Sequence, residues 1–363
     1  MFLHALVTAL IFIGVLFVLV IAHEWGHFFV ARRCGVKVHE FGFGFPPRIA
    51  AWKSKKSGTE YTANWIPLGG FVRLKGEDGS EKNDVDSFGH KPMWQRLAIL
   101  FAGVFMNFVV GFLLFTIVYL RGMDAPVAFA GVGAQLSNQR AIVTDALVGS
   151  PAGAAGVLAG DQIVAINGVT ISAAADAVTN LKLHGADEII VTVARGAEKK
   201  ELHMRAVDLP EGVHGIGVRM TDMAFQKYPV GAAVHIAALD TAGTATMIFR
   251  ALGDLIKTLF KSGKVGADVA GPVGIAQITG QVARTGITPL LQLMAILSIN
   301  LGVLNVLPFP ALDGGRALFV VLQKFFGKRM KDGVEQAAHL IGFALLMALV
   351  IVVTVRDVIH LVK

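Results

Sequence analysis

Long uncharged runs alternate with polar stretches along the 363-residue chain. A helix needs about 20 consecutive apolar residues to cross a lipid bilayer, and four runs reach that length. The pattern therefore predicts an α-helical polytopic membrane protein with four transmembrane helices. We place these helices, in chain order, within residues 1–33, 93–121, 285–315 and 336–356.

A further apolar stretch, Tyr228–Phe260, is interrupted by Asp240, Arg250 and Asp254. Its length would allow a fifth crossing, but an ionised side chain at the centre of a membrane helix costs about 2.5–3.5 kcal/mol or more. Three such charges favour an amphipathic helix that lies on the membrane surface or covers a groove. We therefore assign residues 222–284 to amphipathic and linker helices on the outer face.

Basic residues gather in the segments that follow the first and the third apolar runs. Cytoplasmic loops of membrane proteins carry an excess of lysine and arginine, so both segments are expected on the cytoplasmic side. The polypeptide between the second and third helices, and both termini, are then expected outside. The basic residues are Arg32, Arg33, Lys37, Arg48, Lys53, Lys55 and Lys56 after the first run, and Arg316, Lys324, Lys328, Arg329 and Lys331 after the third.

The composition agrees with a membrane protein that carries a polar insert. Hydrophobic residues make up 54% of the chain and charged residues 16%, whereas soluble domains carry about 25% charged residues. The formal charge of +7 does not indicate nucleic-acid binding, because the basic residues lie beside apolar runs and form no aromatic-interleaved patch. Cys34 is the only cysteine, which excludes a disulfide framework and a cysteine-based metal site.

Residues 23–27, at the end of the first run, read His-Glu-Trp-Gly-His. Two histidines four residues apart lie about 40° apart on one face of a helix, so His23 and His27 can bind one metal ion. Glu24 lies roughly 100° round from His23, where a base that takes a proton from water beside the metal belongs. The alternative is a helix with two packed histidines and a surface glutamate, and the cost of a carboxylate inside a membrane argues against it.

A catalytic zinc ion usually has three protein ligands and one open position, so the two histidines leave one ligand to be found. The third predicted helix runs in the same direction as the first and ends at Asp313, which therefore arrives at the cytoplasmic edge with the histidines. Pro308 and Pro310 break the helix just before it and open a water-filled pocket. Asn305, near the break, is a candidate for orienting a substrate, with helix–helix hydrogen bonding as the alternative.

The segment 34–92 between the first two helices is too apolar for a solvated loop. Thr59–Trp65 alternates weakly and Phe71–Leu74 is strand-like, which predicts a membrane-associated β-hairpin with its turn near Gly69-Gly70. A sheet edge beside a metal centre can bind an extended peptide as an added strand. The alternative is a loop that lies on the lipid headgroups. The candidate substrate-binding residues are Gly70, Phe71, Val72, Arg73 and Leu74.

An α+β domain is predicted in the outside segment, at residues 131–208. Ser150–Gly156 and Ala159–Gly168 read as helix, turn, strand and turn, and Asn167-Gly168 is a strong hairpin-turn dipeptide. A β-branched strand follows at Glu188–Ala194. This string resembles the PDZ domains of membrane and periplasmic proteases, which capture extended peptides by strand addition. The resemblance implies one inserted PDZ domain that binds peptide or filters substrates, and a small mixed domain without a ligand is the alternative.

Two distant motifs in this order resemble the bacterial site-2 protease family, of the regulator of sigma-E protease type. They are the histidine motif at 23–27 and the sequence Asn305–Gly314, with the PDZ-like string between them. Gly69–Val72 and Gly271–Ile275 also resemble segments of the family, so the match spans nearly the whole chain. The best-known relatives carry two tandem PDZ domains, whereas this sequence has room for one, so a filter that needs a pair is not expected.

The resemblance implies a zinc-dependent intramembrane endopeptidase of the bacterial cytoplasmic (inner) membrane. Its active site would lie near the cytoplasmic face and its PDZ domain on the periplasmic or extracellular side. The implied substrates are transmembrane segments of pre-trimmed proteins such as anti-sigma factors, and also remnant signal peptides. By resemblance, one Zn²⁺ ion is bound by His23, His27 and Asp313, Glu24 is the base, and Asn305 helps to hold the substrate.

Two other classes of protein would account for parts of the pattern. A metal transporter would use the same ligands along a permeation path, but it would carry polar residues on both halves of several spans, whereas here they gather at the cytoplasmic end. A non-catalytic membrane scaffold would bind partners through the PDZ-like domain alone and would not require Glu24. The zinc content of the purified protein distinguishes a scaffold from a protease.

Overall fold

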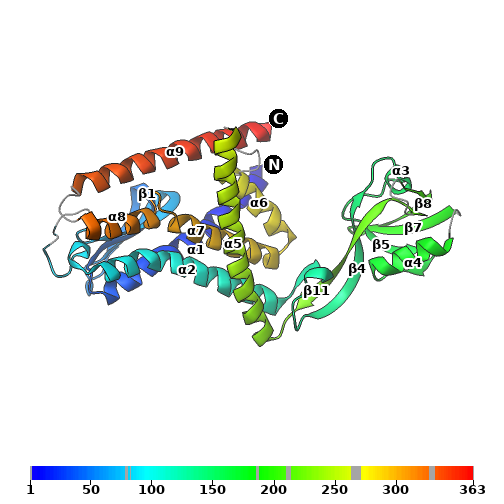
Figure 1. Cartoon of the computed structure of the whole chain (residues 1–363), viewed down its shortest axis with the longest axis horizontal. Helices are drawn as coiled ribbons and strands as arrows, with labels where there is room; N and C mark the ends of the chain where they lie inside the picture. Colours follow the sequence, from blue (N-terminus) through cyan, green and yellow to red (C-terminus); the bar gives the residue numbers. More distant parts are fainter. Residues whose placement is uncertain are drawn as a thin grey trace. The chain divides into compact units, whose positions relative to one another are not determined.

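The computed structural model describes residues 2–77, 81, 83–184, 188–209, 214–262, 271–326 and 332–362. The chain folds into two compact units (Figure 1). The first, named here the helical unit, contains residues 1–116 and 237–363, and the second, the sheet unit, contains residues 117–236. Helices make up most of the first unit apart from one hairpin, and one large β-sheet dominates the second.

Five helices of the described chain are long and apolar enough to cross a membrane, by their length and composition. The expected number of four is therefore not confirmed, because the stretch expected on the membrane surface forms one continuous 33-residue helix, α5. Residues 263–270 of that expected outer segment, and Lys328, Arg329 and Lys331 of the expected cytoplasmic loop, lie outside the described residues. The five helices are α1 (Phe2–Arg33), α2 (Met93–Arg121), α5 (Val230–Ser262), α7 (Ile287–Val306) and α9 (Asp332–Val362).

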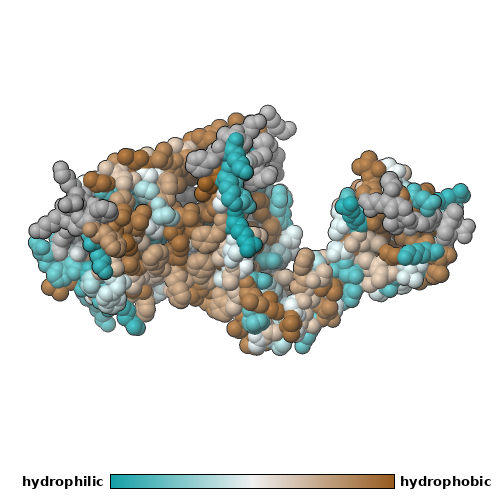
Figure 2. All heavy atoms as spheres, viewed as in Figure 1, coloured by the Kyte–Doolittle hydropathy of each residue, from teal (hydrophilic) through white to brown (hydrophobic). Residues whose placement is uncertain are grey.

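The part of α5 that belongs to the helical unit, from Ala237 onward, runs across the direction shared by α1, α2, α7 and α9 (Figure 1). The start of α1 and the end of α9 lie at one end of this unit, whereas β1 (Val38–Lys53) and α8 (Asp313–Phe326) lie at the other. Figure 2 shows apolar side chains over much of this unit, including α9. Large side chains such as Leu340 and Val352 are exposed there, as expected of a surface that contacts lipid.

The third expected span is interrupted, because α7 ends at Val306 and α8 begins at Asp313. Leu307 has an extended backbone, and Pro308 has no N–H with which to continue the helix. The expected segment 285–315 therefore consists of α7, a loop at 307–312 and the first residues of α8. This loop leads directly into Asp313, the first residue of α8.

The short helix α6 (Pro272–Thr285) packs against α1, α7 and α9. Its N-cap is Gly271, which has no side chain to accept hydrogen bonds from the free N–H groups of the first turn. Asp357 of α9 supplies the acceptor instead, since its Oδ2 lies 2.7 Å from the Gly274 nitrogen. This contact ties the last turns of α9 to α6.

The expected β-hairpin is present, formed by β1 and β2 (Glu60–Leu74), but its turn lies between these strands at residues 54–59. The prediction of a turn near Gly69-Gly70 was wrong, because both glycines lie inside β2. Gly69 has a φ of 79°, a conformation that favours glycine. Gly69 lies between two parts of β2, residues 60–63 and residues 70–73, which both pair with residues 40–43 of β1.

Residues 40–43 occupy the middle of this small sheet. They pair with residues 70–73 on one side and with residues 60–63 on the other. The Gly70–Leu74 segment is therefore an outer strand, and within the described chain no further strand pairs with its other edge. The hairpin thus ends in a strand edge that can accept another chain.

The sheet unit is built on one antiparallel sheet with the strand order β3-β11-β4-β5-β7-β8, and β6 pairs with β5. The sheet continues past Asp208, where the sequence led us to end the domain, because β11 pairs with β4 along most of its length. A separate small pair is formed by β9 (Val207–Asp208) and β10 (His214–Gly215). The remaining bounds are β3 (Met123–Pro126), β4 (Gln135–Ala146), β5 (Gln162–Ile166), β6 (Val169–Thr170), β7 (Glu188–Arg195), β8 (Glu198–Arg205), β11 (Val218–Lys227), α3 (Pro151–Ala154) and α4 (Ala174–His184).

The core of the sheet unit is aliphatic. Ile163, Ile166 and Val191 from β5 and β7 are fully buried, and α4 packs against β4, β5 and β11. Asn167 and Gly168 both have a positive φ and join β5 to β6, so the predicted tight turn is present.

A buried ion pair holds the start of β5. The carboxylate of Asp161 is 1% exposed and accepts two hydrogen bonds from Arg195, both at 2.8 Å. This guanidinium, with help from the Leu158 N–H, lowers the pKa of Asp161 below its ordinary value. The ionised carboxylate therefore stabilises the folded unit above about pH 4, and this stabilisation is lost as the pH falls through the lowered pKa.

We expect Asp161→Asn to lower the hydrogen-exchange protection of β5 and β7 at pH 7 by about tenfold or more, because hydrogen bonds to a buried charge are removed. The variant should also lose less protection than wild type between pH 5 and pH 3. Hydrogen–deuterium exchange of the full-length protein in detergent, corrected for the intrinsic rate at each pH, measures both effects. Asp145→Asn, at an exposed position of β4, is the control, and equal acid sensitivity of Asp161→Asn and wild type would contradict the assignment.

Candidate metal centre

The two histidines of the motif lie on one face of α1, near its C-terminal end, and are 7% and 8% exposed. Helix α2 covers them at close range. A Cβ built on Gly26 would lie 2.9 Å from the backbone nitrogen of Gly103, and a Cβ on Gly103 would lie 2.8 Å from Cε1 of His23. A side chain at either glycine would push the helices apart, so the two glycines allow α2 to pack directly on the imidazoles.

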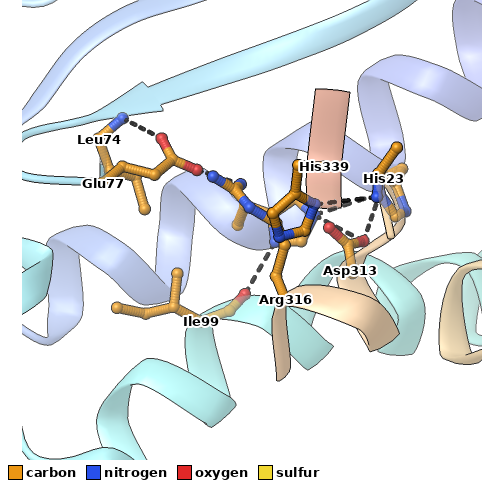
Figure 3. Close-up of polar contacts among 9 residues, drawn as sticks. His23, Leu74, Glu77, Ile99, Asp313, Arg316 and His339 are labelled. Carbon is orange, nitrogen blue, oxygen red and sulfur yellow. Dashed lines mark hydrogen bonds and ion pairs between the residues drawn. The ribbon is translucent and has the colours of Figure 1, made fainter. Parts of the chain in front are cut away.

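Asp313 completes a triangle of three ligand atoms (Figure 3). Its Oδ2 lies 3.1 Å from Nε2 of His23 and 3.3 Å from Nε2 of His27. The two Nε2 atoms are 3.2 Å apart. Within the described residues, no other group of three His, Cys, Asp or Glu side chains converges in this way. The structure thus brings together the three residues that the sequence suggested as ligands.

Hydrogen bonds from α2 fix the direction of both imidazoles. Nδ1 of His27 lies 2.8 Å from the carbonyl oxygen of Ile99, which can only accept, so in neutral His27 the proton is on Nδ1 and Nε2 presents a lone pair. Nδ1 of His23 lies 2.9 Å from the side-chain amide of Asn107. Ile99, Gly103 and Asn107 are spaced by four residues and therefore share one face of α2.

The orientation of the Asn107 amide is tied to the tautomer of His23. With its nitrogen toward His23, Asn107 donates to Nδ1, and in neutral His23 the proton is then on Nε2, where it would block metal binding. With its oxygen toward His23, Asn107 accepts a hydrogen bond from the Nδ1–H, an assignment that rests on the hydrogen-bond network because the two ends of an amide look alike. This orientation leaves Nε2 of His23 as a second lone pair directed at Asp313.

The triangle fits a zinc ion. Three acceptors at 3.1–3.3 Å repel one another unless a cation lies between them, and Oδ2 of Asp313 is buried with no hydrogen-bond donor in the described chain. Ligands at about 2.0–2.1 Å from a tetrahedral zinc ion are about 3.3 Å from one another, which matches the observed edges. Two imidazoles and one carboxylate, with a fourth direction available, form a typical catalytic zinc set.

Helix α9 holds the loop at 307–312, which leads into Asp313. Ala311 has a φ of 78°, which is strained for a residue with a Cβ, and its N–H donates to Nδ1 of His339 at 2.9 Å. One turn further along α9, a Cβ on Gly342 would lie 2.6 Å from Cβ of Pro310. His339 and Gly342 therefore hold the loop at two points one turn apart.

A cavity of about 860 Å³ lies beside the triangle. Glu24 and Asn305 line it, and so does the outer strand of the hairpin from Gly70 to Leu74. A Cβ on Gly70 would lie 2.9 Å from Cγ of Glu24, so this strand approaches α1 closely. Every residue expected at the site from the sequence therefore lines one cavity.

Several residues around the site were not found from the sequence. Asn107 stands in an uncharged run, where a polar side chain is by default functional, and this signal could have found it. Ile99 acts through its carbonyl and Gly103 through the lack of a side chain, so no residue pattern marks them. Arg316 lies one turn after Asp313 and forms an ion pair with Glu77 (Figure 3), and only the fold brings these two together.

The chain matches a known family over nearly its whole length. The model of peptidase family M50 matches residues 11–349. The regulator of sigma-W protease RasP of Bacillus subtilis is 31% identical over an alignment of 437 residues, which covers 97% of this chain and 98% of that protein. The zinc metalloprotease RasP of Shouchella clausii is 30% identical over 435 residues, with 97% and 98% coverage. A relative from Clostridium acetobutylicum is 35% identical over 345 residues, with 94% and 95% coverage.

Among solved structures, the chain is similar to the PDZ domain of an SdrC-like protein from Listeria monocytogenes. The sequence identity is 18% and the TM-score is 0.21. The similarity covers 22% of this chain and 85% of that domain.

We expect Asn107→Ala to weaken zinc binding by about 10–100-fold, because the partner of a ligating histidine fixes its ring orientation and its tautomer. Titration of the purified full-length protein with a chelator of known affinity, with bound zinc measured by mass spectrometry, determines the change. Asn300→Ala removes an amide of α7 that does not line the cavity and should bind zinc as wild type does. Unchanged affinity in Asn107→Ala would show that the amide has no part in the site.

Proposed function

Since the chain belongs to peptidase family M50, its activity is that of a zinc metalloendopeptidase, and we propose that it cleaves peptide bonds within the membrane-spanning segments of other proteins. The observation that carries this proposal is the convergence of His23, His27 and Asp313 beside a cavity that also contains an open strand edge. Ligands at the end of a long apolar helix lie within reach of membrane-embedded polypeptide, and an open strand edge can hold such polypeptide extended.

In the proposed reaction, His23, His27 and Asp313 hold one Zn²⁺ ion. When bound, the ion supplies the Lewis acidity that lowers the pKa of water and polarises a peptide carbonyl. Glu24 follows His23 directly and lines the cavity, so it takes a proton from the attacking water and returns it to the leaving amine. Asn305 lines the same cavity near the end of α7, and we assign it to hydrogen bonding with the substrate backbone.

The substrate helix must unwind before it is cut, because its carbonyl groups are engaged in hydrogen bonds to residues four positions along the chain. Unmade backbone hydrogen bonds cost several kcal/mol each in an apolar environment, on the order of 2–7 kcal/mol. Pairing with the Gly70–Leu74 strand replaces the hydrogen bonds that are lost. The hairpin thereby stabilises the extended form next to Glu24.

We propose four membrane crossings, with α5 on the outer surface. The last turns of α1 and the loop after α7 meet at the metal triangle, so α1 and α7 cross in the same direction. Because α2 returns the chain outside, the segment between α2 and α7 must make an even number of crossings. Helix α6 has 14 residues, or about 21 Å, which is shorter than the roughly 30 Å hydrocarbon core. If α5 crossed the membrane, α6 would be too short to bring the chain back to the outer side before α7.

This arrangement agrees with two further features. The start of α1 and the end of α9 lie at the same end of the helical unit (Figure 1), as an even number of crossings requires. The basic residues after the first and third apolar runs support a metal centre near the cytoplasmic face and a sheet unit outside. The protein is then a multi-pass component of the bacterial cytoplasmic membrane.

The relative from Bacillus subtilis is named a regulator of sigma-W protease. By analogy we propose that the substrates include single-span anti-sigma factors that another protease has trimmed outside, and remnant signal peptides. The sheet unit is assigned to the exclusion of untrimmed proteins or to the binding of their exposed ends. Co-expression with candidate anti-sigma factors, followed by mass spectrometry of the products, tests the substrate class directly, and intact substrates in every case would contradict it.

We expect Glu24→Gln to retain zinc but to lose cleavage by about 10²–10⁴-fold, because the amide keeps the shape of the side chain and cannot take a proton. Cleavage of a single-span substrate by purified protein and the zinc content of the same samples are the measurements. Near-wild-type turnover would refute the role of Glu24 as the base. Glu81→Gln, a more exposed carboxylate in the turn after the hairpin, is the control and should cleave normally.

We expect deletion of the sheet unit to leave the metal centre active while untrimmed substrates become accessible. Met123 and Gln226 are neighbours on β3 and β11, about 4.5–5.5 Å apart between their Cα atoms, so a short Gly-Ser link can replace residues 124–225 without moving the ends. The same link inserted after Met123 without a deletion is the control. Loss of zinc and of all cleavage in the deletion variant would instead show that the sheet unit is required for folding of the rest.

A further inference from the structure

The open edge of the hairpin has a defined end at Leu74. Successive residues of a strand direct their backbone groups to opposite sides of the strand. The Lys75 N–H donates to the carbonyl of Lys37 at 2.9 Å, so Lys75 faces the β1 side. Leu74 therefore faces the open edge, and so do Val72 and Gly70.

Glu77 occupies both backbone groups that Leu74 directs to this edge. Its Oε2 accepts a hydrogen bond from the Leu74 N–H at 3.0 Å, and its own N–H donates to the Leu74 carbonyl at 3.4 Å. An incoming strand can therefore pair at Gly70 and Val72 but not at Leu74. The usable edge is roughly 7 Å long, the length of two residues of strand.

Both ends of this usable edge are fixed relative to the metal triangle. At one end Gly70 lies against Glu24 of α1, since a Cβ there would come within 2.9 Å of Cγ. At the other end Glu77 forms an ion pair with Arg316 (Figure 3). Arg316 lies on α8, one turn after Asp313. One helix therefore carries both a candidate ligand and the residue that anchors Glu77.

We propose that Glu77 is a positioning residue that limits how many residues of a substrate are held extended, and thereby fixes which bond is cut; Arg316 holds Glu77 in this position. The inference rests on the proposed function and identifies the residue that sets the register of the substrate on the strand edge. Beyond Val72 the substrate must leave the sheet and return to helix, so the distance from its helix–strand boundary to the cleaved bond is set. If the Leu74 N–H becomes free, the extended segment can lengthen by two residues, because a shift of two keeps the same side chains on the cavity side.

The test compares Glu77→Ala with Glu77→Gln in the full-length protein, using a single-span substrate that carries one helix-breaking residue. The alanine variant frees the Leu74 N–H, which the Glu77 side chain had occupied, and we expect a second product cut two residues from the wild-type bond. The ratio of the two products should change by roughly 2–10-fold, the factor that one net backbone hydrogen bond provides. The glutamine variant keeps an oxygen that accepts from Leu74, so it should cut at the wild-type bond alone even if its rate falls. Mass spectrometry of the products gives both positions.

Glu81→Ala, which removes another carboxylate four residues further along the chain, is the matched control and should give the wild-type bond alone. A purely structural role of Glu77 would lower the rate without moving the cleaved bond, so a single unmoved product in Glu77→Ala overturns the proposal. The double variant Glu77→Ala/Arg316→Gln removes the unpaired charge that the single variant leaves. If this variant binds zinc and gives only the wild-type product, or none, the proposal is also overturned. Absence of cleavage by wild type would instead refute the proposed function.

Discussion

Three lone pairs that point at one another are the interaction on which the rest of the helical unit depends. Nε2 of His23, Nε2 of His27 and Oδ2 of Asp313 lie within 3.1–3.3 Å of one another. Such a group is repulsive by itself, so the surrounding helices must hold it in place. The face of α2 that carries Ile99, Gly103 and Asn107 orients the imidazoles, and α9 holds the loop before Asp313. A cation that binds this arrangement and not the unfolded chain stabilises the fold by its binding free energy.

The second constraint is that backbone polar groups in apolar surroundings must be paired. An outer strand at membrane depth violates this rule wherever its edge is open, so the open part should be short and should face a cavity. The hairpin meets both conditions. Gly70 and Val72 line the cavity, and Glu77 satisfies Leu74, the next outward-facing residue. The groups left open are therefore the ones that a substrate could satisfy, which gives the edge a role in binding.

The long helices and the convergence of the three candidate ligands could be predicted from the sequence, because their signals are local or depend on depth alone. A four-residue spacing puts His23 and His27 on one face, and the alternation of spans brings Asp313 to the same level. The partners of these residues could not be predicted, since the contact between Asn107 and His23 joins residues 84 positions apart. Such contacts depend on how helices pack, which hydropathy does not encode.

The errors in the predicted strands have the same origin. Residues 40–43 lie in a run of alternating phenylalanine and glycine, which gives no clear strand signal, yet they form the middle of the small sheet and displace the expected turn. The sheet unit extends past Asp208 because β4 needs a partner that the chain supplies only at Val218–Lys227. For α5 the charges argued for the membrane surface, whereas its length and composition satisfy the criteria for a span. Only the fold shows that α5 runs across the direction shared by the other four long helices.

Helix α8 joins the candidate ligand Asp313 to Glu77, the residue proposed to set the substrate position. Asp313 and Arg316 are three residues apart on this helix, so a rigid movement of α8 displaces both by similar amounts. A displacement that shifts the ligand atom would also shift Glu77 through its ion pair with Arg316, and with it the end of the usable strand edge. The distance between Asp313 and Glu77 is therefore preserved under small movements of α8. If Asp313 and Glu77 were supported by separate helices, thermal motion would move the two residues independently.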